Sequence, residues 1–171
     1  VAWESELTLE YARGIARELT AIGVPVLLND PLKGQLVGRY SDRARQAAAW
    51  GATVYLAFHV NAGTGRYALA GYANLGGHDL LPARASRIAV EILSELRERF
   101  PVLRGGELKR YGALDFGGGT IRPAARAGIP AVLLEPFFGD EPTHRAELVP
   151  KLDQLGACIA QAVRAAWLTL P

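Results

Sequence analysis

Two polar side chains stand directly after apolar runs, where they could do chemistry. His59 follows the run at residues 53–58, and Glu135 follows the run at residues 129–134. If both runs are strands of an α/β sheet, their carboxyl ends are where functional groups gather. A neutral imidazole is a good zinc ligand, and a nearby carboxylate can act as the base for a metal-bound water. Taken singly, His59 could be a hydrogen-bonded strand-end residue and Glu135 a salt-bridge partner or helix-cap acceptor.

The elements that must position these two residues alternate along the chain. Apolar residues at helical spacing predict helices over residues 5–21, 41–50, 82–100 and 145–168. Short apolar runs predict strands over residues 24–28, 53–58, 66–74 and 129–134. Ser41 is expected to cap the second helix and Gly51 to end it. The pattern predicts an α/β fold: a single domain with a largely parallel central sheet and helices on both faces.

The composition is that of a globular domain. The chain has 171 residues, of which 50% are apolar and 21% charged, and its formal net charge is +2. Its Arg residues are spread along the chain, so we expect no nucleic-acid partner, although the mild positive charge would suit an anionic polymer such as a cell wall. The single Cys158 allows no internal disulfide. The sequence contains no stretch of about 18 apolar residues, so we predict no transmembrane segment.

Three segments, in order, resemble the zinc-dependent N-acetylmuramoyl-L-alanine amidases of the third amidase family. Residues 43–62 are similar to the family's Arg-containing helix and the strand that ends in Ser-Ile-His-Ala-Asn-Ala, with His59 sixteen residues after Arg43. Residues 129–138 are similar to its Pro-Ala-Val-Leu-Val-Glu strand. Residues 4–12 are similar to its Glu-Lys-Asp-x-x-Leu-x-x-Ala helix start. Together the segments extend over nearly the whole chain.

The resemblance implies an amidase catalytic domain over residues 1–171, with a phosphorylase/hydrolase-like fold. It assigns zinc binding to Glu4 and His59 and the catalytic carboxylate to Glu135. Glu6 is a rival for the role of Glu4, but its spacing to the following Leu and Ala fits less well. Without the resemblance, Glu4 would be an acidic residue that stabilises a helix N-terminus.

The resemblance also suggests Arg43 and Asn61 as substrate-binding residues. Their simpler interpretations are a structural helix residue for Arg43 and a turn residue for Asn61. The two remaining histidines, His78 and His144, match no position that the family uses for metal, and we expect them in surface loops.

The sequence departs from the family in one important respect. The family's first zinc ligand is a His in an Asp-Pro-Gly-His-Gly-Gly turn, and no such turn occurs here. The chain also begins with Val and contains no Met. We therefore expect a processed or truncated domain, with the third zinc ligand upstream of Val1. Gly139-Asp140 replaces the family's usual Ser-Asn, which affects substrate details more than the fold.

The function implied is zinc-dependent cleavage of the amide between N-acetylmuramic acid and the L-alanine of the stem peptide. The expected partner is peptidoglycan, and the expected location is extracytoplasmic (periplasm, cell wall or secreted) or that of a phage lysin. Two alternatives stay open: another zinc amidohydrolase or carboxypeptidase on a similar fold, and a metal-free, inactive wall-binding domain.

Overall fold

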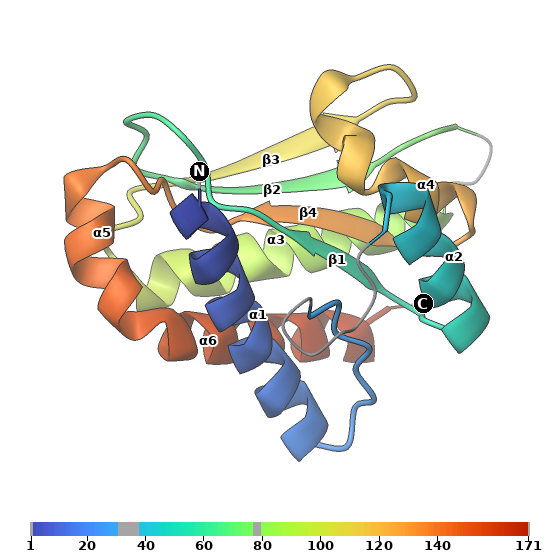
Figure 1. Ribbon diagram of the computed structural model, residues 1–171, viewed down its shortest axis with the longest axis horizontal. Helices are drawn as coiled ribbons and strands as arrows, with labels where there is room; N and C mark the ends of the chain where they lie inside the picture. Colours follow the sequence, from blue (N-terminus) through green and yellow to red (C-terminus); the bar gives the residue numbers. More distant parts are fainter. Residues whose placement is uncertain (1, 31–37, 77–79, 171) are drawn as a thin grey trace.

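The computed structural model describes residues 2–30, 38–76 and 80–170. It contains one four-stranded sheet with helices on both faces, which confirms the α/β single-domain prediction (Figure 1). The helices are α1 Ala2–Ala21, α2 Tyr40–Trp50, α3 Leu80–Arg99, α4 Arg122–Arg126, α5 Pro142–Leu148 and α6 Leu152–Leu168, with short 3₁₀ helices η2 Phe116–Thr120 and η3 Val149–Lys151. The strands are β1 Tyr55–Phe58, β2 Ala68–Ala73, β3 Gly106–Tyr111 and β4 Ala131–Glu135. None of the helices in these ranges is long and apolar enough to cross a membrane.

The sheet consists of two parallel pairs that run in opposite directions. The strand order is β1-β4-β2-β3; β1 is parallel to β4, β2 is parallel to β3, and β2 is antiparallel to β4. The predicted parallel pairing therefore holds within each pair but not between them. As a result, the carboxyl ends of β1 and β4 lie at the same edge as the beginnings of β2 and β3.

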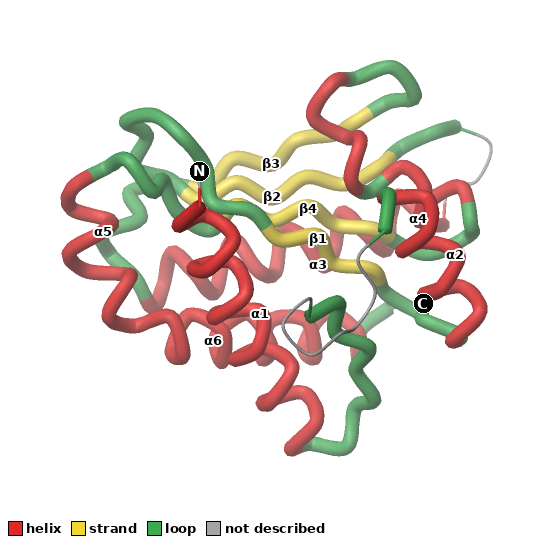
Figure 2. The backbone as a smooth tube through the Cα atoms, in the orientation of Figure 1, coloured by secondary structure: helices red, strands yellow, loops and turns green. Residues whose placement is uncertain are grey.

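The two faces of the sheet are buried by different helices. Val132 and Leu134 of β4 join a large core with residues of α1, α3 and α6, which lie together on one side of the sheet (Figure 2). The alternate residues Ala131 and Leu133 join a smaller core with α2 and α4 on the other side. Because side chains alternate along a strand, Glu135 continues the second set. We call this side of the sheet the Glu135 face.

The predicted strand at residues 24–28 is wrong. The structure has no strand there, and Val24 and Leu27 are 38% and 41% exposed. An apolar run becomes a strand only when a neighbouring strand satisfies its backbone groups. Among the described strands, the sheet ends at β1, so this segment pairs with none of them.

The bounds of two predicted helices also differ in the structure. The predicted helix at 145–168 is divided into α5, η3 and α6, because Pro150 cannot donate the backbone hydrogen bond of a continuous helix. Ser41 does not cap α2: the N-cap is Arg39, whose backbone N–H donates to the Asp42 carboxylate at 3.0 Å. Gly51 ends α2 as predicted, in the left-handed conformation. Residues 104–128, which are rich in Gly and for which no element was predicted, contain β3, η2 and α4.

The crossing of α1 and α6 depends on Gly156. A Cβ added to Gly156 would lie 2.9 Å from the Tyr11 carbonyl oxygen and 3.0 Å from the Gly14 Cα. The two backbones therefore approach as closely as they do only because Gly156 has no side chain at the contact. This close approach helps to set the position of α1, which carries Glu4.

Replacing Gly156 by Val should lower the free energy of unfolding by about 1–3 kcal/mol, the usual cost of overpacking. Urea denaturation measures the difference. Ala165→Val is the matched control, because it adds a β-branched side chain at an exposed position of the same helix. Equal losses in the two variants would contradict a close crossing at Gly156.

Candidate functional site

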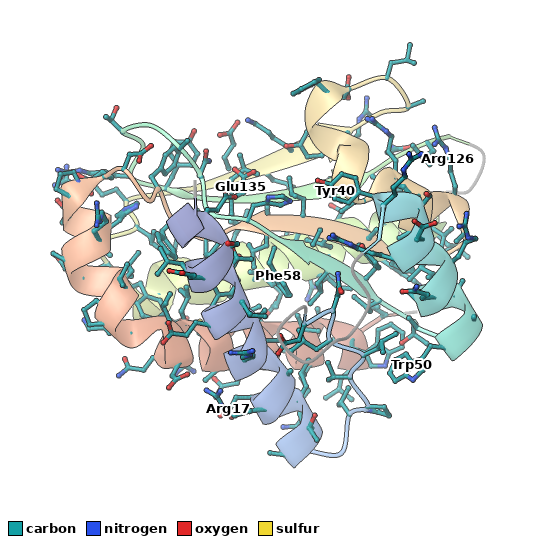
Figure 3. All side chains as sticks on the ribbon, in the orientation of Figure 1. Arg17, Tyr40, Trp50, Phe58, Arg126 and Glu135 are labelled. Atoms are coloured by element: carbon teal, nitrogen blue, oxygen red, sulfur yellow. The ribbon has the colours of Figure 1, made fainter. Side chains whose placement is uncertain are left out.

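His59 and Glu135 lie next to each other at the ends of β1 and β4. Phe58 is paired with Leu134, and the His59 backbone N–H donates to the Leu134 carbonyl at 2.9 Å. Continuing this register by one residue places His59 beside Glu135 on the same face of the sheet. Figure 3 labels Glu135 at the end of β4, near the first turn of α1. The two residues chosen from the sequence are thus brought together.

Glu4 completes this arrangement from α1. Its Oε1 lies 3.5 Å from His59 Nδ1, and it accepts a hydrogen bond from the Val60 backbone N–H at 3.4 Å. Both side chains are about one-third exposed (36% and 33%), so they are open to a ligand. Glu6, the rival, is exposed on the same helix and makes no such contact with His59 among the described pairs.

Tyr11 fixes the backbone of His59 to α1. Its side chain is fully buried, its hydroxyl donates to the His59 carbonyl at 2.8 Å, and its ring packs edge-on against Phe58 at 5.5 Å. Burial raises the pKa of Tyr11 well above its ordinary value, so the hydroxyl keeps its proton and remains a donor. Tyr11 was not among the residues predicted for the site. The available signal was its hydroxyl, since a buried tyrosine usually finds a hydrogen-bond partner.

Glu135 has the electrostatic character of a proton acceptor. Burial raises its pKa, and the charges of Glu4 and Glu107 raise it further. The His59 and Lys109 charges act in the opposite direction, but the pKa stays above its ordinary value. A carboxylate with a raised pKa is a stronger base than an ordinary glutamate, which suits general acid–base chemistry.

The Glu4–His59 pair fits two positions of a metal site. Two ligands that each lie about 2.0–2.1 Å from a tetrahedral zinc are about 3.3 Å apart, close to the distance between these donor atoms. Carboxylate oxygen and imidazole nitrogen are also the ligand types that zinc takes. Within the described ranges, however, no three His, Cys, Asp or Glu side chains gather closely enough to hold a metal ion.

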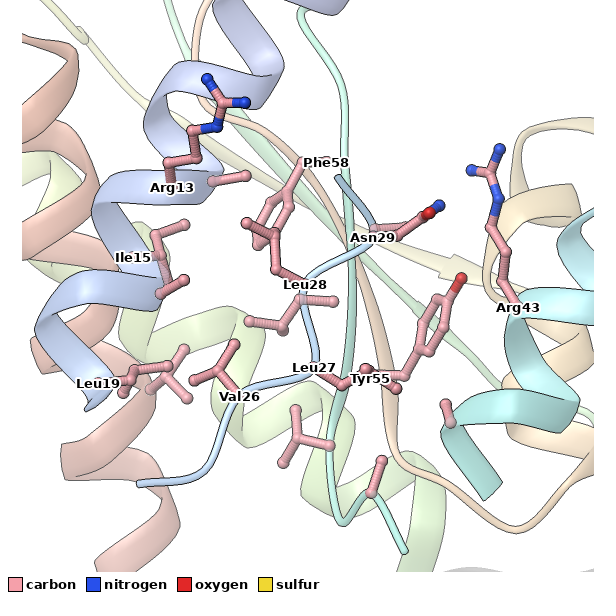
Figure 4. Close-up of a pocket in the computed structure, with 18 of the residues that line it drawn as sticks. Arg13, Ile15, Leu19, Val26, Leu27, Leu28, Asn29, Arg43, Tyr55 and Phe58 are labelled. Carbon is pink, nitrogen blue, oxygen red and sulfur yellow. The ribbon is translucent and has the colours of Figure 1, made fainter. Parts of the chain in front are cut away.

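A cleft of about 2100 Å³ opens between α1, residues 22–29, β1 and α2. Its lining is rich in apolar side chains, including Ile15, Val26 and Phe58 (Figure 4). Glu4 and His59 border the cleft, whereas Glu135 lies next to them outside its lining.

Arg43 is separated from this pair by the length of β1. Its Nε donates to the Gly38 carbonyl at 3.0 Å, and its guanidinium lies over the Tyr40 ring at 5.5 Å. Its charge acts on Tyr55, which begins β1, while His59 follows the end of that strand. The structure thus does not bring Arg43 to His59 and Glu135.

Asn61 joins the loops that follow β1 and β4. Its backbone N–H donates to the Phe137 carbonyl, and its carbonyl accepts from the Gly139 N–H, both at 2.9 Å. Its side-chain Oδ1 accepts from the neighbouring Ala62 N–H at 2.9 Å. This local bond matches the simpler interpretation of Asn61 as a turn residue.

His144 is buried in α5 and holds the loop after Glu135. Its Nδ1 accepts a hydrogen bond from the Phe138 backbone N–H at 3.0 Å. The backbone N–H of His144 donates to the Glu141 carboxylate at 2.8 Å. Glu141 is in turn paired with Arg66 at 3.0 Å. The expectation of a surface-loop residue is wrong for His144, which is 0% exposed. His78 lies outside the described residues.

His144 should make folding stability depend on pH. Burial lowers its pKa below the ordinary value of about 6.5, and Arg66 adds to the effect against the opposing charges of Glu141 and Glu147. Below about pH 6.5 the unfolded chain therefore binds a proton that the folded chain does not, so stability falls as pH falls. His144→Gln removes this titration while keeping a polar side chain of similar size.

Melting temperatures measured from pH 7.5 to 5 should accordingly fall less in His144→Gln than in the unmodified chain. The stability difference can reach about 1.4 kcal/mol for each pH unit of pKa shift. Lys151→Gln, at an exposed position in η3, should keep the original slope. An unchanged slope in His144→Gln would contradict the assignment.

Two charged residues on β3 were missed in the sequence. Leu69 of β2 is paired with both Glu135 and Glu107, and Gly71 is paired with Lys109. Glu107 and Lys109 therefore lie on the Glu135 face, two strands away from Glu135. Their side chains form an ion pair at 3.4 Å.

The described chain matches one protein family and several solved structures. A family model described as N-acetylmuramoyl-L-alanine amidase matches residues 1–165. A comparison with curated proteins gave no match. The structure resembles Cwp6 from Clostridium difficile with a TM-score of 0.72 and 19% identity, over 95% of this chain but 25% of Cwp6.

Two further structures resemble this chain over more of their own length. The N-acetylmuramyl-L-alanine amidase Ami1 from Mycobacterium smegmatis has a TM-score of 0.72 and 19% identity, over 98% of this chain and 76% of Ami1. The N-acetylmuramoyl-L-alanine amidase from Clostridium difficile 630 has a TM-score of 0.70 and 19% identity, over 98% and 86% of the two chains. These likenesses confirm the fold.

Proposed function

Since this chain belongs to the family of N-acetylmuramoyl-L-alanine amidases, we propose that it hydrolyses the amide between N-acetylmuramic acid and the L-alanine of the peptidoglycan stem peptide. The observation that carries the proposal is the meeting of Glu4, His59 and Glu135 at one end of the sheet. Two of them are donors suited to a metal, and the third is a carboxylate suited to proton transfer.

In this proposal Glu4 and His59 hold a zinc ion. What supports their role is the 3.5 Å approach of their donor atoms and the Tyr11 hydroxyl that fixes the His59 backbone. A catalytic zinc takes three protein ligands and a water, and these two residues would account for two of the three. When bound, zinc lowers the pKa of a water and polarises the substrate carbonyl.

Glu135 moves the protons. Its carboxylate takes a proton from the attacking water, whose oxygen forms the new bond to the carbonyl carbon of the lactyl group. Glu135 then gives that proton to the nitrogen of L-alanine as the C–N bond breaks, so the products are the free carboxylic acid and the peptide amine. Both roles need a carboxylate beside Glu4 and His59, and the pairing of β1 with β4 and the effect of both charges on Glu135 support this assignment.

The substrate implies where the protein acts. Peptidoglycan lies outside the cytoplasmic membrane, so we propose that the protein acts in the periplasm, in the cell wall or as a secreted or phage enzyme. The formal net charge of +2 is compatible with an anionic wall polymer.

Digestion of purified peptidoglycan with zinc supplied tests the proposal. Mass spectrometry should detect stem peptides that begin with a free L-alanine amine, together with peptide-free glycan. Release of single amino acids would instead indicate a carboxypeptidase.

A wall-binding module without catalysis is the second candidate. It is favoured by the finding that the described residues bring no third metal ligand to Glu4 and His59. Such a protein would sediment with peptidoglycan, bind no zinc and release no peptide, and that result would overturn the amidase proposal.

A further inference from the structure

We propose that Lys109 forms a subsite for a free carboxylate on the stem-peptide residue that follows L-alanine. The proposal rests on the proposed amidase function and adds a basis for choosing among stem peptides. On the Glu135 face, this subsite lies on the opposite side of Glu135 from Glu4 and His59.

The direction of the substrate follows from the chemistry of the two halves of the bond. The carbonyl half must face the Glu4–His59 pair on the β1 side of the site. The leaving nitrogen must face Glu135, because Glu135 returns the proton to it. The next strands across this face are β2 and then β3, so the peptide that follows L-alanine extends toward β3.

The residues along this path form an apolar floor without a polar barrier. On β2 the positions between Glu135 and β3 are Leu69, which is 2% exposed, and Gly71. The Tyr111 ring lies over Gly71, where an added Cβ would be 2.2 Å from it. No long polar side chain from these two β2 positions therefore stands between Glu135 and Lys109.

The distances suit the second residue of the stem. Neighbouring strands are about 4.8 Å apart, so β3 lies roughly 10 Å across the face from β4. An extended peptide covers about 3.3 Å per residue. The Lys109 side chain spans part of the remaining gap, so its ammonium group can meet a carboxylate on the residue after L-alanine.

The positive charge of Lys109 makes it the residue that would attract a peptide carboxylate. The carboxylates of Glu4, Glu107 and Glu135 make this part of the molecule negative, which would repel an anionic peptide. Lys109 is the lysine whose charge acts on Glu135, so its ammonium is within electrostatic reach of the site.

The existing ion pair does not prevent Lys109 from binding substrate. The Lys109 and Glu107 side chains are 43% and 40% exposed, and exposed pairs contribute only about 0–1 kcal/mol. An ammonium group has three donors, so Lys109 can bind a second carboxylate while Glu107 remains close.

Two muramoyl peptides test the subsite. They are identical except that the residue after L-alanine carries either a free carboxylate or a carboxamide. Isothermal titration calorimetry on Glu135→Gln, which should not cleave them, measures both dissociation constants. We expect this protein to bind the carboxylate form about 5- to 20-fold more tightly.

Adding Lys109→Gln should remove this preference, and Lys109→Arg should retain most of it. The matched control is Arg110→Gln, which removes one positive charge from the neighbouring residue of β3, exposed on the other face. Glu107→Gln should strengthen the preference, because it removes a carboxylate that competes for Lys109.

Three results would overturn the subsite: equal binding of the two peptides, absence of binding by both, or equal losses in Lys109→Gln and Arg110→Gln. The peptidoglycan digestion decides the amidase function separately. A protein that releases stem peptides but fails the binding test would keep its proposed function and lose only this subsite.

Discussion

Glu135→Gln should lower the rate of stem-peptide release by about 10²–10⁴-fold, the range that a general acid–base residue contributes. Gln has nearly the same shape as Glu but cannot take a proton from water or return it to the leaving nitrogen. Because Glu135 is the last residue of β4 and only partly buried, the fold should tolerate the change. Release of peptides from purified peptidoglycan, followed by mass spectrometry, measures the effect.

The matched control for this experiment is Glu147→Gln. Glu147 is an exposed glutamate in α5, so its replacement makes the same chemical change away from the site. It should keep the original activity. Full activity in Glu135→Gln would remove the proton-transfer role from this carboxylate.

His59→Ala should abolish zinc binding and with it the activity. We expect a loss of zinc affinity that exceeds the roughly 10- to 100-fold cost of removing an outer-shell partner, because His59 would be a direct ligand. Zinc content after dialysis and titration with a zinc-sensitive dye measure this loss. His144→Gln is the control, because it removes a histidine that lies away from Glu4 and His59 and should leave zinc binding unchanged.

An equal zinc content in His59→Ala and the unmodified protein would contradict the metal site at this position. The histidine comparison also separates a local effect from general instability. His144 is the more deeply buried of the two, so a loss of zinc that merely reflected unfolding would be greater in His144→Gln.

The core of the site could be predicted because it depends on short, strongly apolar strands. Residues 129–134 contain no polar side chain, and the first polar residue, Glu135, ends β4. The same reasoning located His59. Its approach to Glu4 required the path of α1 across the end of β1, which local sequence does not encode, and came from the family resemblance instead.

The strand directions could have been inferred more fully from the connections. Only residues 59–67 link β1 to β2, and a parallel return normally needs a crossover of about a dozen residues or more. This short link favours the opposite direction that β2 in fact takes. The long stretch between β3 and β4 gave no comparable signal.

β3 was missed because both of its faces are partly exposed. Glu107 and Lys109 alternate with Leu108 and Arg110, so neither face is uniformly apolar. The predicted strand at residues 24–28 failed for the opposite reason. Its side chains are apolar enough, but a strand also needs a neighbour, and local sequence does not specify one.

The position of β1 at the edge of the sheet has a consequence for handling the protein. Among the described strands β1 has one neighbour, and residues 54–58 are apolar, uncharged and free of proline. Exposed edges with these properties are sites where identical chains stack into intermolecular sheets. The strand that precedes His59 is thus also a candidate site of aggregation. We expect the amount of soluble protein to fall steeply as the protein concentration rises.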